Sequence, residues 1–202
     1  MFLLITNVYI RMDTVAKAKV LTKDEIKRVE KIIAAEPNAA RNLLAFKLSV
    51  LGGMRVGEIA ALNVGQVRGM DGKSVAVAHL SKHQTKGNKA RRVFFNDELQ
   101  AAISKFLARN VHLRDDDALI QSTKTLKHFS NVTLCVLFKS LYRKSGIETS
   151  SHSGRRTFAT VKNANAVGMR TIQQLMGHKN IQTTALYCDV TDEQLANAAN
   201  VC

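Results

Sequence analysis

The chain has 202 residues, of which 46% are hydrophobic and 23% are charged, a balance typical of a globular domain and not of a disordered chain. Lys and Arg number 30 against 16 Asp and Glu, a formal net charge of +14, so the expected partner is a polyanion such as nucleic acid, not an acidic small substrate. No apolar stretch approaches the ~20 residues of a membrane-spanning helix, and the N-terminus lacks a signal-peptide pattern, which predicts a cytoplasmic, DNA-associated protein without membrane contact.

Apolar residues recur at helical spacing along most of the chain. The first such segment follows Thr22, whose hydroxyl can cap a helix with Glu25 at the capping-box position. The second ends at Gly52 and Gly53, and glycine commonly terminates helices. The helices expected in chain order are residues 23–35, 39–51, a segment starting near Arg55, 97–108, 131–144, 155–166, 171–176, 181–186 and 192–199.

The pattern changes in the middle of the chain. Residues 74–80 and 92–95 are rich in β-branched or aromatic side chains, and the polar, basic segment SKHQTKGNKAR lies between them. This predicts a hairpin or small antiparallel sheet with a basic loop. With a single proline, no visible repeat and no linker, the expected fold is one compact domain, mainly α with a small antiparallel β-hairpin.

Four polar motifs lie at the edges of these elements. They are, in chain order, GGMRVGEIAALNVGQV, TKGNKARR, SHSGRRTFAT and LMGHKNIQTTALY. In this order and at these spacings they resemble the catalytic domain of the tyrosine recombinases, the phage integrase family, from about residue 21 to residue 199. The resemblance implies six catalytic residues, namely Arg55, Lys86, His152, Arg155, His178 and Tyr187.

The residue types suit attack on a phosphodiester. Negative charge develops on the non-bridging oxygens, and the guanidinium groups of Arg55 and Arg155 can hold these oxygens bidentately. Tyr187, with an ordinary pKa of about 10, needs nearby cations and a base to act as a nucleophile at neutral pH. His152 is the candidate base and Lys86 the candidate acid for the leaving 5′ oxygen.

The remaining polar residues of the motifs have supporting roles. His178 follows the Gly177 helix stop and is expected to hydrogen-bond the phosphate, and Glu58 is expected to orient its neighbours. Lys82 competes with Lys86 as the catalytic lysine, but Lys86 matches the KGxKxR pattern of the family. The residues expected to contact DNA phosphates are Lys82, Lys89, Arg91, Arg92 and Arg156.

No metal, ATP or other cofactor is expected. The resemblance implies a covalent 3′-phosphotyrosyl intermediate that conserves the bond energy, and arginines take the place of the cations of two-metal nucleases. The carboxylates of residues 115–117 have no histidine partner at ligand spacing and are expected in a solvated loop. The three cysteines are odd in number and lack CxxC spacing, which fits a reducing compartment and argues against zinc.

The resemblance also implies a domain organisation and an assembly. Most family members carry an N-terminal core-binding domain, whereas only about 20 residues precede the first helix here. We therefore expect residues 1–20 to form an extension and residues 21–202 the catalytic domain, in a natural short form or a fragment. Four protomers are expected on double-stranded DNA, with a monomer in solution and with accessory DNA-bending or directionality factors. The apolar side of the C-terminal segment, Leu195, Ala198 and Val201, can dock on a neighbouring protomer or on its own domain.

The implied activity is site-specific recombination of double-stranded DNA by a tyrosine recombinase. Two alternatives remain open at this stage. A type IB topoisomerase-like enzyme shares the nicking and rejoining chemistry and differs in assembly. A DNA-binding regulator with the same fold would bind without cutting, and the presence of all six site residues argues against it.

Overall fold

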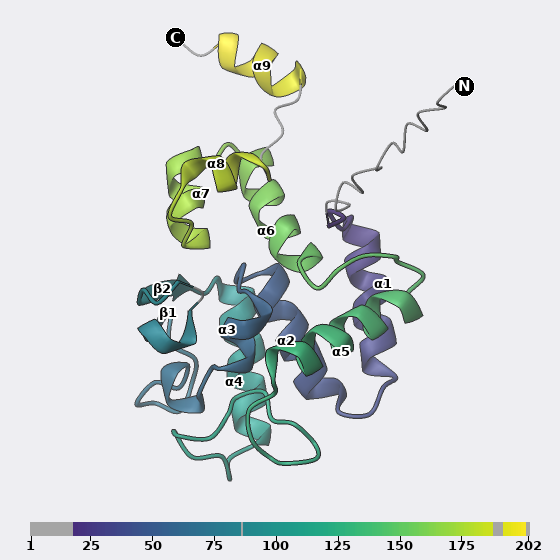
Figure 1. The fold of residues 1–202 in the computed structure, drawn as a ribbon, viewed down its shortest axis with the longest axis vertical. Coiled ribbons are helices and arrows are strands. Elements are labelled where there is room, and N and C mark those ends of the chain that lie inside the picture. The colour runs from purple at the N-terminus through teal and green to yellow at the C-terminus, as the bar shows by residue number, and fades with distance from the viewer. Residues whose placement is uncertain (1–17, 86, 188–191, 201–202) are drawn as a thin grey trace, which may run out of the picture.

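The computed structural model describes residues 18–85, 87–187 and 192–200 (Figure 1). Helices dominate this part of the chain, and strands β1 (Val77–Leu80) and β2 (Arg91–Phe94) form an antiparallel pair with Leu80 opposite Arg91. The predicted fold class, mainly helical with a small antiparallel sheet, is confirmed. The α-helices are α1 (Lys23–Ala34), α2 (Ala39–Val50), α3 (Val56–Ala60), α4 (Asp97–Arg109), α5 (Asn131–Lys144), α6 (Ser153–Ala164), α7 (Met169–Met176), α8 (Ile181–Ala185) and α9 (Asp192–Ala199).

The element boundaries follow local chemistry. The predicted capping box at the start of α1 is present. Thr22 Oγ1 accepts a hydrogen bond from the Glu25 amide, and the Glu25 carboxylate accepts one from the Thr22 amide. The first predicted strand is shorter than expected, because the Ser74 and Val75 amides bond to the Ser104 hydroxyl and the Val67 carbonyl. Helix α6 starts at residue 153, two residues earlier than predicted, so that its first turn holds Arg155.

Two hydrophobic clusters form the interior. The larger one joins α1 to α5 and the hairpin, and α2 contacts α1, α3, α4 and α6. The smaller one consists of Phe158, Ala159, Ile172 and Met176, with Tyr187 packed against it. In Figure 1, α6 leads from the larger body to α7 and α8 at one end of the molecule. None of the described helices is long and apolar enough to cross a bilayer.

Helix α6 packs so closely against α2 that its second residue has no room for a side chain unless neighbouring atoms shift. A Cβ atom on Gly154 would lie 2.5 Å from Ser49 Oγ and 3.1 Å from Val50 Cγ2. Gly57 holds the same second position in α3, but a Cβ atom there meets nothing closer than Asn131 Oδ1 at 3.5 Å. We expect Gly154→Ala to lower the free energy of unfolding by about 1–3 kcal/mol because α6 must move away from α2.

Gly57→Ala is the matched control. Because alanine favours helix over glycine, it should raise the free energy of unfolding by up to about 1 kcal/mol. Urea unfolding of Gly154→Ala and Gly57→Ala measures both changes in the free energy of unfolding. Changes of the same sign and size would show that close packing of α6 on α2 does not determine the effect.

Candidate active site

A buried carboxylate lies at the centre of the site. Arg55 precedes α3, and Glu58, at the third position of that helix, accepts the Arg55 amide at 2.8 Å and the Arg55 guanidinium at 2.9 Å. The Glu58 side chain is 1% exposed, whereas that of Arg55 is 22% exposed. A buried carboxylate needs charged or hydrogen-bonding partners to offset its lost hydration. Arg55 supplies some of these and still reaches the surface.

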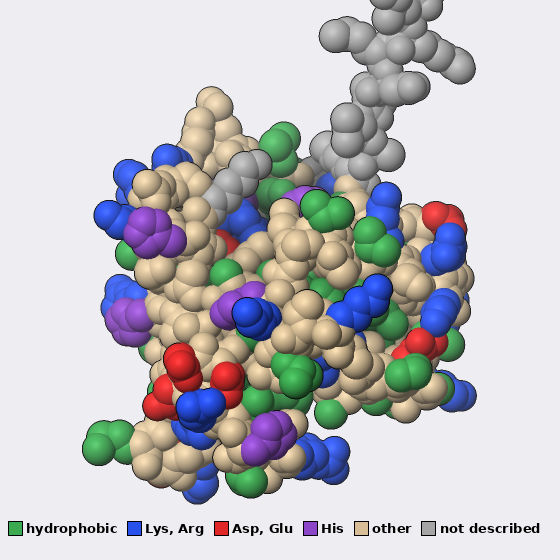
Figure 2. Space-filling model, turned by 60° about the horizontal axis from the view of Figure 1, so that its bottom comes forward, with side chains coloured by type: hydrophobic (Ala, Val, Ile, Leu, Met, Phe, Trp, Pro, Cys, Tyr) green, Lys and Arg blue, Asp and Glu red, His purple; other side chains and the backbone are tan. Residues whose placement is uncertain are grey.

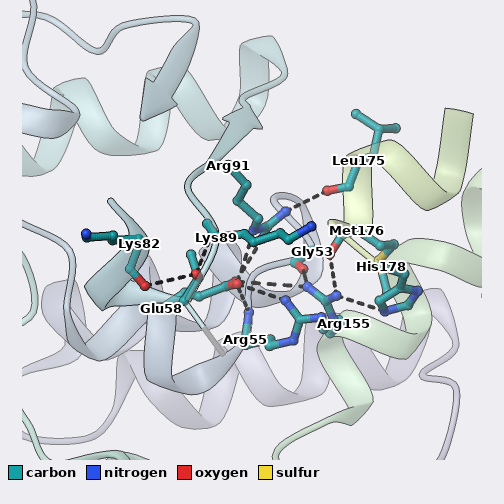
Figure 3. A network of polar contacts seen from close by, with 11 residues as sticks. Gly53, Arg55, Glu58, Lys82, Lys89, Arg91, Arg155, Leu175, Met176 and His178 are labelled. Atoms are coloured by element: carbon teal, nitrogen blue, oxygen red, sulfur yellow. Dashed lines mark hydrogen bonds and ion pairs between the residues drawn. The ribbon is translucent and has the colours of Figure 1, made fainter. Parts of the chain in front are cut away.

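Two further arginines from distant parts of the chain complete the surroundings of Glu58 (Figure 3). Arg91 of β2 donates from Nε to Glu58 Oε1 at 3.1 Å and from Nη2 to Oε2 at 2.8 Å. Arg155 of α6 places Nη1 4.0 Å from Glu58 Oε2. Burial raises the pKa of the Glu58 carboxyl, but Arg91, Arg155 and the Arg55 amide outweigh this and the pKa lies below its ordinary value. Three guanidinium groups around one carboxylate leave excess positive charge for an anion.

Arg155 is held on several sides. Its side chain is 4% exposed, and it donates to the carbonyls of Gly53 and Met176 and to Nε2 of His178. Burial and repulsion from Arg55 lower its pKa, and Glu58 opposes this effect. These bonds fix the plane of the guanidinium at the junction between α3 and the end of α7.

His178 lies directly beyond Gly177, which ends α7 in the left-handed conformation with φ of 60°. Its Nε2 is 3.0 Å from Arg155 Nη2 and its Nδ1 is 2.9 Å from Thr184 Oγ1. Because a guanidinium only donates, Nε2 must accept, and the proton is assigned to Nδ1, which donates to Thr184. Both ring nitrogens are therefore engaged within the protein, and the expected bond from His178 to a phosphate needs the contact with Arg155 to open.

His178 should remain neutral well below the ordinary pKa of histidine. Burial, with the charges of Arg155 and Arg55, lowers its pKa to about 4. The unfolded chain binds the proton near pH 6.5, so the neutral histidine contributes stability that is present above about pH 6.5 and declines as the pH falls towards 4. An NMR titration of the ¹⁵N-labelled imidazole checks this.

Thr184→Val is the matched variant for that titration, because it removes the acceptor of the Nδ1 proton and keeps the shape of the side chain. We expect the His178 tautomer signal to change in this variant. A wild-type His178 that titrates near pH 6.5 would contradict the assigned neutral tautomer.

Tyr187 and His152 are the remaining described members of the candidate set. The Tyr187 ring stacks on that of His178, with centroids 5.7 Å apart and planes at 25°. Its carbonyl accepts from the Thr160 hydroxyl, and Arg156 lies 5.9 Å from its ring centroid. His152 lies exposed at the N-cap of α6, three residues before Arg155. Arg155, His178 and Tyr187 thus form one contiguous group.

A groove of about 740 Å³ runs beside this group. Its cationic lining residues are Arg55, Lys89, Arg91, Arg92 and Lys179. Lys82 is exposed at the start of the short 3-10 helix Lys82–Gln84, and the Thr85 hydroxyl lies within hydrogen-bonding distance of the Lys82 and Lys89 carbonyls. Lys86, the expected general acid, lies outside the described residues.

The sequence predicts that Arg91 contacts DNA from the exposed surface of the basic hairpin. In the structure Arg91 does not lie on that surface. Its side chain is 9% exposed and points to Glu58. The alternation of β2 explains this, because Arg91 shares a face with buried Val93, whereas Arg92 faces solvent. Two-residue periodicity is the signal that would have placed it.

Lys179 is a lining residue that motif reasoning missed. It is exposed directly after His178, and its Cε lies 3.3 Å from the position of a Cβ on Gly87 in the hairpin loop. Its place in the motif LMGHKN was available in the sequence, but its proximity to the hairpin arises only from the packing of α7 beside β2.

The described part of the chain holds no group of three or more His, Cys, Asp or Glu side chains suited to a metal ion. In the loop of residues 115–117, Asp115 pairs with Arg68 at 3.1 Å and Asp117 accepts the Arg114 amide. These carboxylates have structural partners within their own surroundings.

Comparison with known proteins identifies the family of the chain. The sequence model of the phage integrase family matches residues 19–194, and the chain belongs to that family. It is 32% identical over 186 residues to tyrosine recombinase XerC of Caldanaerobacter subterraneus subsp. tengcongensis, covering 89% of this chain and 50% of the relative. It is 32% identical over 184 residues to tyrosine recombinase XerA of Thermococcus onnurineus, covering 89% of this chain and 61% of the relative. The chain thus spans half to three-fifths of the length of these relatives.

Solved structures share the fold. A crystal structure of XerA recombinase matches with a TM-score of 0.72 at 25% identity, covering 89% of this chain and 63% of that chain. The XerH site-specific recombinase bound to its difH substrate matches with a TM-score of 0.68 at 19% identity, covering 90% of this chain and 53% of that one. At that identity the second likeness concerns the fold alone.

Proposed function

We propose that this chain is the catalytic part of a site-specific DNA recombinase that cuts and rejoins double-stranded DNA through a covalent 3′-phosphotyrosyl bond to Tyr187. One observation carries the proposal. Arg155 bonds to His178, lies 4.0 Å from the carboxylate that also holds Arg55, and His178 stacks on Tyr187. A cationic cluster suited to a phosphate and a phenol suited to attack on it are therefore neighbours.

The arginines supply the electrostatic part of the mechanism. Arg55 lines the groove with a partly exposed guanidinium, while Arg155 is fixed behind it by its bonds to carbonyls. Attack on the phosphorus increases negative charge on the non-bridging oxygens, and fixed cations stabilise this charge without reorganising. Glu58 holds the arginines together and prevents their mutual repulsion from displacing them.

The proposed covalent step uses Tyr187, His152 and Lys86. Tyr187 Oη attacks phosphorus and gives its proton to His152, the P–O5′ bond breaks, and Lys86 protonates the leaving 5′ oxygen. The 5′-hydroxyl of a second strand then attacks the phosphotyrosine and gives its proton to Lys86, the P–O bond to Tyr187 breaks, and His152 returns the proton to the released Tyr187. Because the phosphotyrosyl bond retains the energy of the phosphodiester, the cycle needs neither ATP nor a metal ion.

The substrate proposal rests on charge and shape. Lys89, Arg92 and Lys179 line the groove beside the site, with Lys82 exposed on the adjoining hairpin. Basic side chains are spread over the face seen in Figure 2, whereas acidic ones occupy a few spots. Such a surface gives salt-dependent contacts to DNA phosphates. The structure of XerH was solved with its difH substrate bound, and this supports a recombination site on DNA as the partner of this chain.

Assembly is proposed on the same basis. Residues 21–202 would act as one catalytic domain, four copies would meet on DNA, and accessory DNA-bending or directionality factors would determine the outcome. Helix α9 exposes Leu195, which is 59% exposed, and this residue can contact a neighbouring protomer or its own domain. Val201, the last residue of that apolar side, lies outside the described residues.

A trapping experiment tests the proposal. DNA fragments recovered by protein pulldown supply candidate sites, which are built into a nicked suicide duplex that loses its 5′-hydroxyl fragment after cleavage. We expect a covalent protein–DNA band on a denaturing gel. Absence of the band on sites that the chain binds would contradict cleavage and favour a non-cutting regulator. When the same sites are carried on a plasmid, a product that is only relaxed plasmid, without recombinant joints, would favour the type IB topoisomerase-like enzyme.

A further inference from the structure

The burial of the Arg91 side chain is explained neither by contacts at the surface nor by packing in the apolar core. It is the first residue of β2, and its neighbour Arg92 is exposed. The Arg91 side chain is nevertheless 9% exposed and runs inward beside Val93. Burying an arginine is costly unless its donors are satisfied, so its partners indicate what it does.

These partners belong to two separate helices. Nε and Nη2 of Arg91 donate to the two oxygens of Glu58 in α3, and Nη1 donates to the Leu175 carbonyl in α7 at 2.8 Å. Helix α3 belongs to the larger hydrophobic cluster, whereas α7 builds the smaller one. One planar guanidinium therefore joins both parts of the interior (Figure 3).

The bond to Leu175 acts on the end of α7 that leads to His178. The last carbonyls of a helix lack partners within the helix and carry partial negative charge. Arg91 takes the Leu175 carbonyl and Arg155 the neighbouring Met176 carbonyl, so two cations hold this end. The fit is close, because a Cβ on Gly177 would lie 2.6 Å from Arg91 Cδ.

We propose that Arg91 is a positioning residue that fixes the end of α7, and with it His178, against the Arg55–Glu58 pair. This inference rests on the proposed function, since it assigns Arg91 to assembly of the cleavage site in place of contact with DNA. The planar fork is essential to it. A lysine provides the charge but cannot bind both oxygens of Glu58 and the Leu175 carbonyl at once.

The first test separates binding from cleavage. For Arg91→Ala and Arg91→Lys we expect DNA affinity and its salt dependence close to wild type, with the single-turnover cleavage rate at saturating DNA reduced about 100-fold, as for a misplaced active-site group. Arg92→Ala, on the next residue, should instead weaken DNA binding and reduce the salt slope by about 1. Lys105→Ala on α4, which also removes one positive charge, should behave as wild type in both measurements.

The pH profile of cleavage is a second measurement. It would not shift if Arg91 only stabilised the fold. The charged groups facing Glu58 are Arg55 at the N-cap of α3, Arg91 of β2 and Arg155 of α6, with His178 beyond them. Without Arg91 the pKa of Glu58 should rise, so the acid limb of the cleavage profile moves to higher pH. Arg91→Lys should return the limb towards wild type while its maximal rate stays low. Wild-type rates and profiles in Arg91→Ala would overturn the inference.

A measurement without DNA keeps this inference distinct from the cleavage proposal. The Nδ1 proton of His178, bonded to Thr184, gives an NMR signal in the free protein that we expect to weaken or shift in both Arg91 variants and to stay in Arg92→Ala. If wild type binds DNA but forms no covalent product, the proposed function fails, and the His178 signal alone decides about Arg91. An unchanged signal in Arg91→Ala would overturn the positioning role, whichever way the cleavage assay turns out.

Discussion

Tyr187→Phe is expected to abolish the covalent protein–DNA product while DNA binding persists. The substitution removes only the hydroxyl. The ring can still stack on His178 and pack against the smaller hydrophobic cluster. Loss of a covalent nucleophile should lower the cleavage rate by more than about 10⁴-fold. The denaturing-gel assay on a nicked suicide duplex measures it.

Tyr142→Phe is the matched control for this prediction. Tyr142 is fully buried in the larger cluster beside Phe46 and Phe138, and its hydroxyl faces the backbone of Gly154, so the variant loses a hydroxyl that is closed off from a bound substrate. Cleavage should survive in that variant. A covalent product that persists in Tyr187→Phe would identify a different nucleophile, and unchanged biological activity without any cleavage would favour the regulator.

Glu58→Gln should have the second largest effect, on stability as well as on activity. The neutral amide cannot compensate Arg55, Arg91 and Arg155, which then repel one another in a buried site. Removing one partner of a buried charge cluster costs about 3–5 kcal/mol. Glu98→Gln provides the contrast, because Glu98 is 59% exposed and its partner Lys47 keeps a second carboxylate, Glu30, and such an exposed pair contributes at most about 1 kcal/mol.

The effect of Glu58→Gln should depend on pH with a definite sign. The pKa of Glu58 is lower in the folded state than its ordinary value, so its contribution is fully present above the unfolded pKa of about 4.3. This contribution is lost as the pH falls through the lower folded value. Urea unfolding at pH 7 and at progressively lower pH should show the difference between wild type and variant shrinking. A constant difference would mean that shape, not charge, determines the loss.

The sequence predicted the local features of the fold well and the long-range ones only in part. Capping at Thr22 and the stop at Gly177 depend on neighbouring residues, and both appear in the structure. The contact between Arg55 and Glu58 follows from helical spacing in the same way. The inward course of Arg91 and the approach of Lys179 to the hairpin depend on how α7 packs beside β2, which no local pattern specifies.

The sequence predicted which residues form the site more fully than it predicted their tautomers. The motifs brought Arg155, His178 and Tyr187 into one hypothesis, and the structure places them together. The tautomer of His178 was not predictable, because it depends on Thr184 on one side of the ring and Arg155 on the other. Their catalytic roles stay predictions until cleavage is measured.

The division of the interior into a large and a small hydrophobic cluster has a consequence for how the molecule opens. The smaller cluster between α6 and α7 has four buried side chains, far fewer than the whole of the larger cluster, so α7 and α8 should unfold locally at a lower free energy than the rest. Their amides should exchange hydrogen sooner than those of α2. Such an opening would move Tyr187 and His178 away from Arg55 while the larger body stays folded, so the proposed site could come apart reversibly without loss of the fold.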